Sequence, residues 1–228
     1  MSSEQYGRGD FIGRPVAAGI YGMVRIKICG ITNLEDALLA AQLGADALGF
    51  IFYPQSPRAV APEAAREIIA QLPPFVTSVG VFVDEEAAVV RDLAVRVGLD
   101  WLQLHGKESP DYCRSLGRRV IKGFRVRDKS SLADLAVYRG AAQALLLDTY
   151  KPGQTGGTGE SFDWRLAQDA RQFGPIILAG GLTPDNVARA VAIAQPQAVD
   201  VASGVEAAPG KKDVEKLRAF FSAVVSSQ

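Results

Sequence analysis

Short apolar runs alternate with amphipathic stretches along most of the chain. Each run is four or five residues long and nearly continuous in apolar side chains, which is typical of strands buried on both faces of a parallel sheet. Between the runs, side chains such as Leu34, Leu38 and Ala41 recur with the spacing of one helix face. The eight predicted strands are residues 25–29, 47–51, 78–82, 101–104, 120–124, 144–147, 176–179 and 198–201.

Helix start signals lie between the predicted strands. Ser109 and Thr183 are each followed by a proline, which places a capping side chain directly before a residue suited to the first helical position. Thr32 and Glu35 have the spacing of a capping box, in which two side chains satisfy backbone N–H groups at the helix start. A final helix is predicted at residues 213–225. The chain therefore repeats a strand–helix unit eight times.

Eight strand–helix repeats in about 200 residues predict an α/β fold, the (β/α)8 TIM barrel, as a single domain at residues 23–228. A doubly wound open sheet is the competing architecture, but such sheets rarely need eight regular repeats. Residues 1–22 differ from the rest: they are rich in glycine and serine and have little periodicity. They also lack the charged start and apolar middle of a signal peptide, so we expect a loosely ordered N-terminal extension.

One connection is longer than the others. Residues 149–162 have no apolar pattern and contain four glycines, among them Gly156 and Gly157. Long loops of this kind inside a compact domain are commonly functional lids or disordered segments. Because the loop directly follows Asp148, we interpret it as a lid that covers a bound substrate.

Composition narrows the class of protein. The 25 basic residues balance 25 acidic ones, which leaves no electrostatic footprint of a nucleic-acid-binding protein. No apolar run approaches the roughly 18 to 20 residues that span a bilayer. Two cysteines and one histidine provide neither a disulfide framework nor a histidine-rich metal site. We expect a soluble, cytoplasmic protein without metal, membrane or nucleic-acid partners.

Reactive side chains collect at the ends of the predicted strands, where barrel enzymes place their active sites. Cys29 ends the first strand, and Asp148 follows the sixth. A thiol and a carboxyl at the same end of one sheet are suited to moving two protons on a small substrate. A lone cysteine is more often a small buried hydrophobe, and we interpret Cys113, within a predicted helix, in that way. The position of Cys29 favours a reactive thiol, provided that positive charge or backbone N–H groups lower its pKa.

Three other polar side chains lie in the same predicted region. Asp148 is placed to act as a general acid if its apolar flank raises its pKa; the alternatives are that it caps the lid or pairs with a lysine. His105, which follows the fourth strand, either lines the site or has a structural role. Arg58 follows a loop stiffened by two prolines. Such a guanidinium is suited to receiving a carboxylate in bidentate fashion, although an ordinary surface arginine is the alternative.

Glycines follow the seventh and eighth strands, at the two places where barrels bind phosphate. Gly180 and Gly181 come after the seventh strand, and Ser203 and Gly204 come after the eighth. Backbone N–H groups and a helix N-terminus can cradle a phosphate where no side chain intervenes. Either pair alone would be ordinary turn chemistry. The two together predict a phosphate site.

Seven motifs, in one order along the chain, support a resemblance to a known enzyme family. They are RIKICGIT at 25–32, GADALGFIF at 44–52, LQLHG at 102–106, LDT at 147–149, GGTG at 156–159, FDW at 162–164 and VDVASGVE at 199–206. The sequence resembles phosphoribosylanthranilate isomerase of tryptophan biosynthesis over about residues 24–225. The departure from the family pattern is residues 1–22.

The resemblance implies a specific reaction. It is an Amadori rearrangement, without cofactor, of N-(5-phosphoribosyl)anthranilate to 1-(o-carboxyphenylamino)-1-deoxyribulose 5-phosphate. By motif, Cys29 would be the general base, Asp148 the general acid, and Arg58 the residue that faces the anthranilate carboxylate. The expected partner is thus a small phosphosugar, bound by a monomer or a homodimer.

Three alternatives remain open. A sugar-phosphate isomerase of histidine biosynthesis would be expected to use paired aspartates, so Cys29 argues against it. A synthase that makes indole would use lysine and glutamate at strand ends, and Lys27 lies in its strand without such glutamates. A non-catalytic sensor of phosphorylated ligands could keep the same barrel. A turnover assay separates the sensor from the enzymes.

Overall fold

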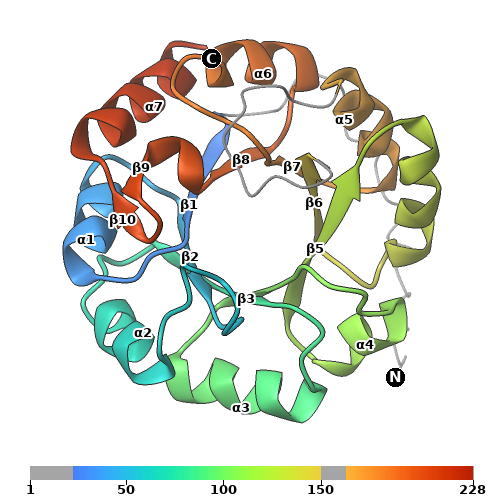
Figure 1. Ribbon diagram of the computed structural model, residues 1–228. Helices are drawn as coiled ribbons and strands as arrows, with labels where there is room; N and C mark the ends of the chain where they lie inside the picture. The colour runs from blue at the N-terminus through green and yellow to red at the C-terminus, as the bar shows by residue number, and fades with distance from the viewer. Residues whose placement is uncertain (1–22, 150–162, 228) are drawn as a thin grey trace, which may run out of the picture.

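Eight parallel strands close into a barrel in the order of the chain, and helices surround it (Figure 1). The computed structural model describes residues 23–149 and 163–227. Strand β8 pairs with β1, which completes the ladder and confirms the predicted TIM barrel over the competing open sheet. The strands are β1 (Arg25–Cys29), β2 (Ala47–Ile51), β3 (Thr77–Phe82), β4 (Trp101–Leu104), β5 (Arg119–Val126), β6 (Ala144–Thr149), β7 (Ile176–Leu178) and β8 (Ala198–Val201).

The connections between strands depart from the regular repeat in two places. A 3-10 helix occupies the position of an α-helix between β5 and β6, and a short antiparallel hairpin, β9–β10, follows β8. The α-helices are α1 (Leu34–Gln42), α2 (Pro62–Ile69), α3 (Ala87–Val97), α4 (Pro110–Ser115), α5 (Arg165–Ala170), α6 (Val187–Ala194) and α7 (Val214–Ser226). The 3-10 helices are η1 (Lys129–Tyr138), η2 (Arg171–Phe173) and η3 (Ser203–Val205), and the hairpin strands are β9 (Glu206–Ala208) and β10 (Lys211–Lys212). None of the described helices has the length and apolarity needed to cross a bilayer.

Two of the three predicted helix starts need correction. Ser109 caps α4 as expected. At α1, however, the side chain of Asn33 accepts the capping hydrogen bond, whereas the Thr32 hydroxyl donates to a carbonyl in the turn of the β9–β10 hairpin. Thr183 is also not a cap, because α6 begins later and the side chain of Asn186 accepts a hydrogen bond from the Thr183 backbone. Both threonines instead form hydrogen bonds within loops at the C-terminal end of the barrel.

Side chains alternate between two faces of each strand, and this alternation places the reactive groups. One apolar cluster joins the outer strand faces to the helices, as at Ile28. A second, smaller cluster of strand residues fills the barrel and includes Leu146. Cys29, one residue after Ile28, therefore points to the inside of the barrel. Asp148, two residues after Leu146, points to the inside as well.

Candidate active site

Cys29 is the last residue of β1 and lies almost completely buried at the C-terminal end of the barrel. Its register partner on β2 is Gly49. A methyl group added to Gly49 would lie 2.8 Å from the Cys29 sulfur and 3.0 Å from the Lys27 Nζ atom. The missing side chain on β2 therefore leaves the space that the thiol and the ammonium group occupy together.

A buried ion pair lies beneath the thiol. Lys27 Nζ donates to Asp200 Oδ1 at 2.8 Å, and both side chains are at most 9% exposed. Burial would lower the pKa of Lys27, but its attraction to Asp200 and Cys29 outweighs burial and the pKa is raised. Lys27 therefore remains a cation beside the sulfur.

Lys27 is thus the positive charge expected near Cys29, but its attraction does not bring the pKa of the thiol below the ordinary value. Burial raises the pKa of the Cys29 thiol, and the opposing attraction of Lys27 lessens this shift without cancelling it. The sulfur consequently holds its proton near neutral pH in this structure. The other cysteine, Cys113, is buried in α4 and free, in agreement with a packing role.

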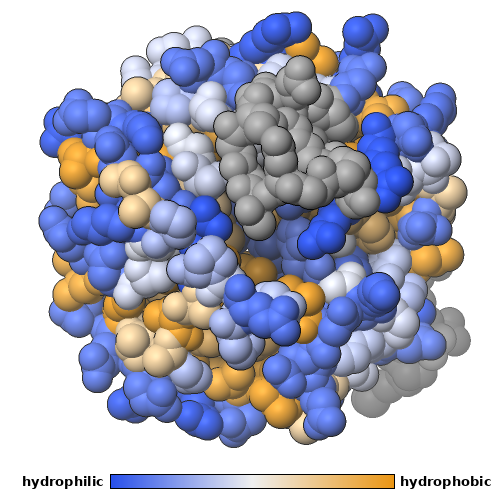
Figure 2. Space-filling model, viewed as in Figure 1, coloured by the Kyte–Doolittle hydropathy of each residue, from blue (hydrophilic) through white to orange (hydrophobic). Residues whose placement is uncertain are grey.

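Asp148 and His105 meet inside the same end of the barrel, where the space-filling view shows a hollow at the centre of the face (Figure 2). His105 Nε2 lies 3.4 Å from Asp148 Oδ2, and the other ring nitrogen lies 3.2 Å from the Gln103 side-chain amide. A methyl group on Gly123 would lie 2.8 Å from His105 Nδ1, so this glycine of β5 makes room for the ring. The sequence placed both residues at strand ends but did not indicate that they form a pair.

Arg58 lies at the rim, in the connection between β2 and α2, and its guanidinium is bound by a carboxylate of the protein itself. Its Nε donates to both carboxylate oxygens of Glu206, at 2.9 and 3.0 Å, and its Nη2 donates at 2.7 Å. The stem of Arg58 crosses Gly30, where an added methyl group would lie 2.8 Å from Arg58 Cδ. Arg58 is therefore held next to the strand end that carries Cys29.

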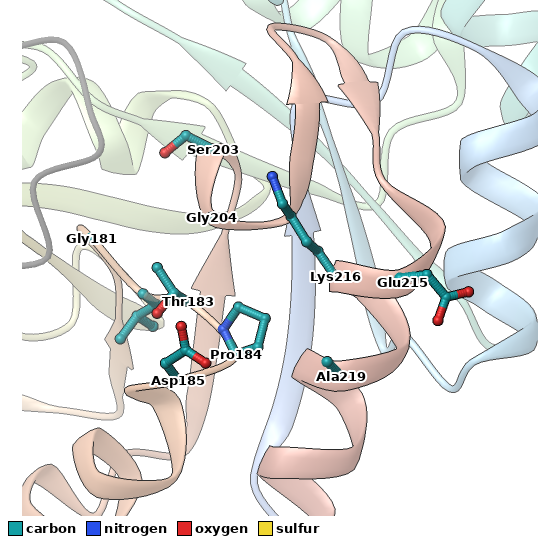
Figure 3. Close-up of a pocket in the computed structure, with 10 residues that line it drawn as sticks. Gly181, Thr183, Pro184, Asp185, Ser203, Gly204, Glu215, Lys216 and Ala219 are labelled. Atoms are coloured by element: carbon teal, nitrogen blue, oxygen red, sulfur yellow. The ribbon is translucent and has the colours of Figure 1, made fainter.

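The predicted phosphate loops line a cavity of about 520 Å³ between β7, β8 and α7 (Figure 3). Gly181, Ser203 and Gly204 all contribute to it, and Lys216 reaches in from α7. Gly180 and Gly181 have left-handed backbone conformations, with φ of 82° and 65°, which favour glycine. The 3-10 helix η3 begins at Ser203, directly after β8, the region in which barrels frequently place a short extra helix at phosphate sites.

The predicted lid cannot be placed in the same way. Gly156 and Gly157 lie outside the described residues, and β6 itself extends to Thr149, the first residue of the expected loop. Among the described residues, no group of three histidine, cysteine, aspartate or glutamate side chains could hold a metal ion.

Sequence reasoning missed four charged residues around this site: Lys27, Asp200, Glu206 and Lys212. All four are at least nine-tenths buried. The available signal was the presence of a charged residue inside an otherwise apolar strand run, at inward positions such as Lys27 and Asp200. Glu206 and Lys212 lie in the β9–β10 hairpin, whose two short strands gave no such pattern.

Thiol, carboxyl and imidazole groups lie inside the C-terminal end of a closed barrel, beside glycine-lined loops after β7 and β8. This arrangement is typical of an enzyme that moves protons on a small phosphorylated substrate. Comparison with known proteins defines the family. The model of the N-(5′-phosphoribosyl)anthranilate isomerase family matches residues 26–223. The chain belongs to this family of isomerases of tryptophan biosynthesis, as the motifs indicated.

Relatives from bacteria match nearly the whole chain. The N-(5′-phosphoribosyl)anthranilate isomerase of Geobacter sulfurreducens is 58% identical over 199 residues, which cover 87% of this chain and 97% of the relative. The enzyme of the same name from Moorella thermoacetica is 53% identical over 203 residues, covering 89% and 90%. Membership of an enzyme family favours catalysis over the sensor alternative.

Solved structures agree with these relatives. Phosphoribosyl anthranilate isomerase from Thermotoga maritima superposes with a TM-score of 0.85 at 47% identity, covering 90% of this chain and all of the other. A second structure, with a TM-score of 0.81 at 44% identity and the same coverage, is a complex of the isomerase with reduced 1-(o-carboxyphenylamino)-1-deoxyribulose 5-phosphate.

Proposed function

We propose that this protein converts N-(5′-phosphoribosyl)anthranilate into 1-(o-carboxyphenylamino)-1-deoxyribulose 5-phosphate by general acid–base catalysis. Cys29 is the base and Asp148 is the acid. The observation that carries this assignment is that both side chains point into the barrel from the C-terminal ends of β1 and β6. Membership of the isomerase family supports the reaction, and the relative bound to the reduced product supports the phosphosugar substrate.

The reaction begins at the ring oxygen of the ribose. Asp148 gives its proton to this oxygen, the bond from the oxygen to C1′ breaks, and the sugar opens to an iminium ion. The positive nitrogen makes the proton on C2′ acidic, and the Cys29 thiolate removes it to give an enolamine. The enolamine then takes a proton at C1′ and releases the proton of the 2′-hydroxyl, which yields the ketone. The substrate gains and loses no atoms overall.

The two groups must start in opposite protonation states, which requires different surroundings. Cys29 must lose its proton before it can act, and Lys27 is the cation that stabilises the resulting thiolate. Asp148 must begin with a proton, and His105 is the neighbouring group with which it can exchange one. The acid and the base therefore have separate polar partners, His105 directly after β4 and Lys27 on β1.

The substrate is bound by residues in the loops at the C-terminal end of the barrel. Gly181, Ser203 and Gly204, which line the cavity, receive the phosphate through their backbone N–H groups, supported by the N-terminus of η3, and the left-handed Gly180 shapes the loop that carries Gly181. Arg58 receives the anthranilate carboxylate. Gly156 and Gly157 belong to the proposed lid, which lies outside the described residues.

Steady-state turnover of freshly prepared substrate, followed as loss of anthranilate fluorescence, tests this proposal. We expect Cys29→Ala and Asp148→Asn each to lower kcat by about 100-fold or more, because each removes a group that transfers a proton. Cys113→Ala is the matched control and should keep its activity. Full activity in both site variants would contradict the assignment. A chain lacking residues 1–22 should remain active, since we propose that this segment is an extension outside the catalytic domain.

We also propose that the protein is a homodimer that acts in the cytoplasm. The dimeric nature of the phosphoribosylanthranilate isomerase of Thermotoga maritima, 43% identical to this chain, supports the first point. Phe75 supports it as well, because its side chain is fully exposed in the connection that leads into β3. The biosynthetic role of the family supports the second point.

A further inference from the structure

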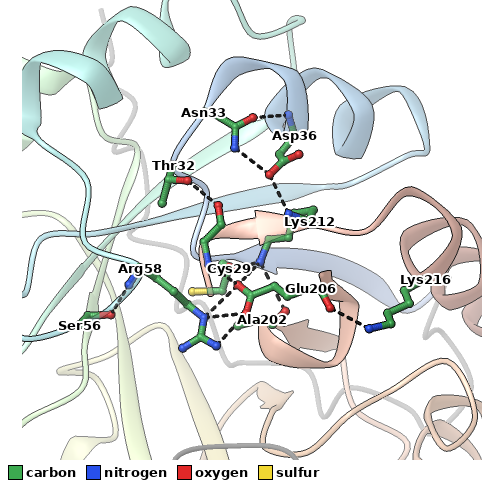
Figure 4. A network of polar contacts seen from close by, with 11 residues as sticks. Cys29, Thr32, Asn33, Asp36, Ser56, Arg58, Ala202, Glu206, Lys212 and Lys216 are labelled. Atoms are coloured by element: carbon green, nitrogen blue, oxygen red, sulfur yellow. Dashed lines mark hydrogen bonds and ion pairs between the residues drawn. The ribbon is translucent and has the colours of Figure 1, made fainter. Parts of the chain in front are cut away.

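Glu206 is a buried carboxylate on which two cations converge (Figure 4). It begins strand β9, and its side chain is 4% exposed. Arg58 donates three hydrogen bonds to it, and Lys212 Nζ lies 3.0 Å from Oε1. Burial would raise the pKa of Glu206, but its contacts with Arg58 and Lys212 outweigh burial and lower the pKa. The carboxylate therefore stays ionised and holds both partners.

The geometry of the contact determines which part of Arg58 remains available. A guanidinium is planar and has two edges that can each bind a carboxylate in bidentate fashion. Glu206 occupies the edge formed by Nε and Nη2. The second edge, formed by Nη1 and the outer N–H of Nη2, is the one left for a ligand. The Arg58 side chain is 21% exposed, so part of it can reach such a ligand.

The cluster of Glu206, Arg58 and Lys212 is also in contact with the end of β1, where Cys29 lies. Lys212, whose side chain is fully buried, donates from Nζ to the backbone carbonyl of Cys29 at 2.6 Å as well as to Glu206. The stem of Arg58 packs on Gly30, the residue after Cys29. Arg58 and the Cys29 thiol are therefore linked through one set of buried contacts that includes Glu206 and Lys212.

We propose that Glu206 is a positioning residue for this reaction: it fixes the orientation of Arg58 so that the free edge of the guanidinium receives the aryl carboxylate of the substrate. Glu206 does not touch the substrate. It makes the site selective for an o-carboxyphenylamino sugar over the corresponding phenylamino sugar. This inference rests on the proposed function, since it takes the anthranilate carboxylate to bind at Arg58.

Ligand selectivity tests the inference. The probes are reduced 1-(o-carboxyphenylamino)-1-deoxyribulose 5-phosphate and its reduced phenylamino counterpart, bound to the full chain and measured by calorimetry. Glu206→Gln replaces one of the two acceptor oxygens by an NH2 donor, so it cannot pair two oxygens with the Nε and Nη2 donors of Arg58. We expect it to weaken binding of the carboxylated probe by about tenfold and to leave the phenylamino probe within about twofold. Arg58→Met should lose the same selectivity, and Glu206→Gln should add nothing in the Arg58→Met background.

An equal loss for both probes, or losses that add in the double variant, would overturn the inference, because a merely structural glutamate behaves in that way. Glu108→Gln is the matched control: Glu108 is equally buried and pairs with Lys122 at 3.2 Å, in the connection after β4. It should keep the ratio of the two affinities. If Glu206→Gln does not fold, Glu206→Asp is measured in its place, because it moves the carboxylate away from Arg58 by one methylene group.

The outcomes separate this inference from the proposed function. A wild-type protein that does not turn over the substrate contradicts the proposed function. A wild-type protein that does turn over, with selectivity lost in Arg58→Met and retained in Glu206→Gln, contradicts the role of Glu206 alone.

Discussion

At the scale of single residues, the ion pair between Lys27 and Asp200 requires an explanation, because burying two charges is costly. A buried pair of this kind contributes little to stability compared with apolar side chains of similar size. Its position beside the Cys29 sulfur gives it a chemical use. The positions of Cys29 and Asp148 at the C-terminal ends of their strands could be predicted, because each follows an apolar run directly. The pairing of Lys27 with Asp200 could not be predicted, because the sequence of one strand does not reveal which residue of another strand will lie beside it.

Replacing Lys27 by methionine should raise the pKa of Cys29 further. The ammonium favours the charged thiolate, so its removal favours the thiol, and the sulfur then reacts only at higher pH. The rate of alkylation by iodoacetamide, followed against pH in a Cys113→Ala background, measures this shift. In the profile of activity against pH, the limb that reports loss of the Cys29 proton should also move to higher pH.

Because Lys27→Met leaves Asp200 buried without its cation, the double variant Lys27→Met with Asp200→Asn is measured beside it. Lys122→Met is the control for loss of a buried lysine, since Lys122 donates to the carbonyls of Leu104 and Gly106, at and just after the end of β4, and not to the region of Cys29. An alkylation profile that is the same with and without Lys27 would show that the ammonium does not affect the thiol.

At the scale of elements, the eight strands were predictable because each is a continuous apolar run buried on both faces. The 3-10 helix η1 was less predictable, since it lies between β5 and β6, where the strand–helix repeat predicts an ordinary α-helix. The β9–β10 hairpin was missed because its strands have only three and two residues and no alternation. Its shape depends on contacts far along the chain, such as the one between Lys212 and the Cys29 carbonyl.

The hairpin should make the stability of the protein sensitive to acid. The pKa of Glu206 is lowered in the folded protein, so the unfolded chain binds its proton more readily. The stability that this group contributes is therefore complete above its ordinary value of about 4.3 and is lost as the pH falls through the lower, folded value. Urea unfolding midpoints between pH 3 and 6, a range of about three units around that ordinary value, test this. Glu206→Gln should flatten the profile, and an unchanged slope would contradict the prediction.

At the scale of the whole molecule, the described surface carries an apolar side chain that a monomer would leave in water. Phe75 is fully exposed and has a left-handed backbone, with φ of 73°, a conformation that bulky residues rarely adopt. It follows Pro73 and Pro74, which stiffen the chain before it. Aromatic residues are enriched at contacts between subunits, and we therefore place this side chain in the proposed dimer contact.

Phe75→Ser should convert the proposed homodimer into a monomer, because it removes the apolar side chain that we place in the contact between subunits. Light scattering coupled to size-exclusion chromatography measures the mass directly. Val95→Ser, which changes an exposed valine on α3, is the control and should leave the mass unchanged. A wild-type protein that is already monomeric, or a Phe75→Ser variant that remains dimeric, would exclude this role for Phe75.

The pairing of β8 with β1 has a consequence for self-association. A closed ladder presents no unpaired strand edge, and such edges are what other chains use as templates for aggregation. In the described part of the chain, the sheet that does have edges is the β9–β10 hairpin, which is too short to recruit a long partner strand. Loops at the mouth of the barrel can therefore change in sequence without exposing an aggregation-prone surface.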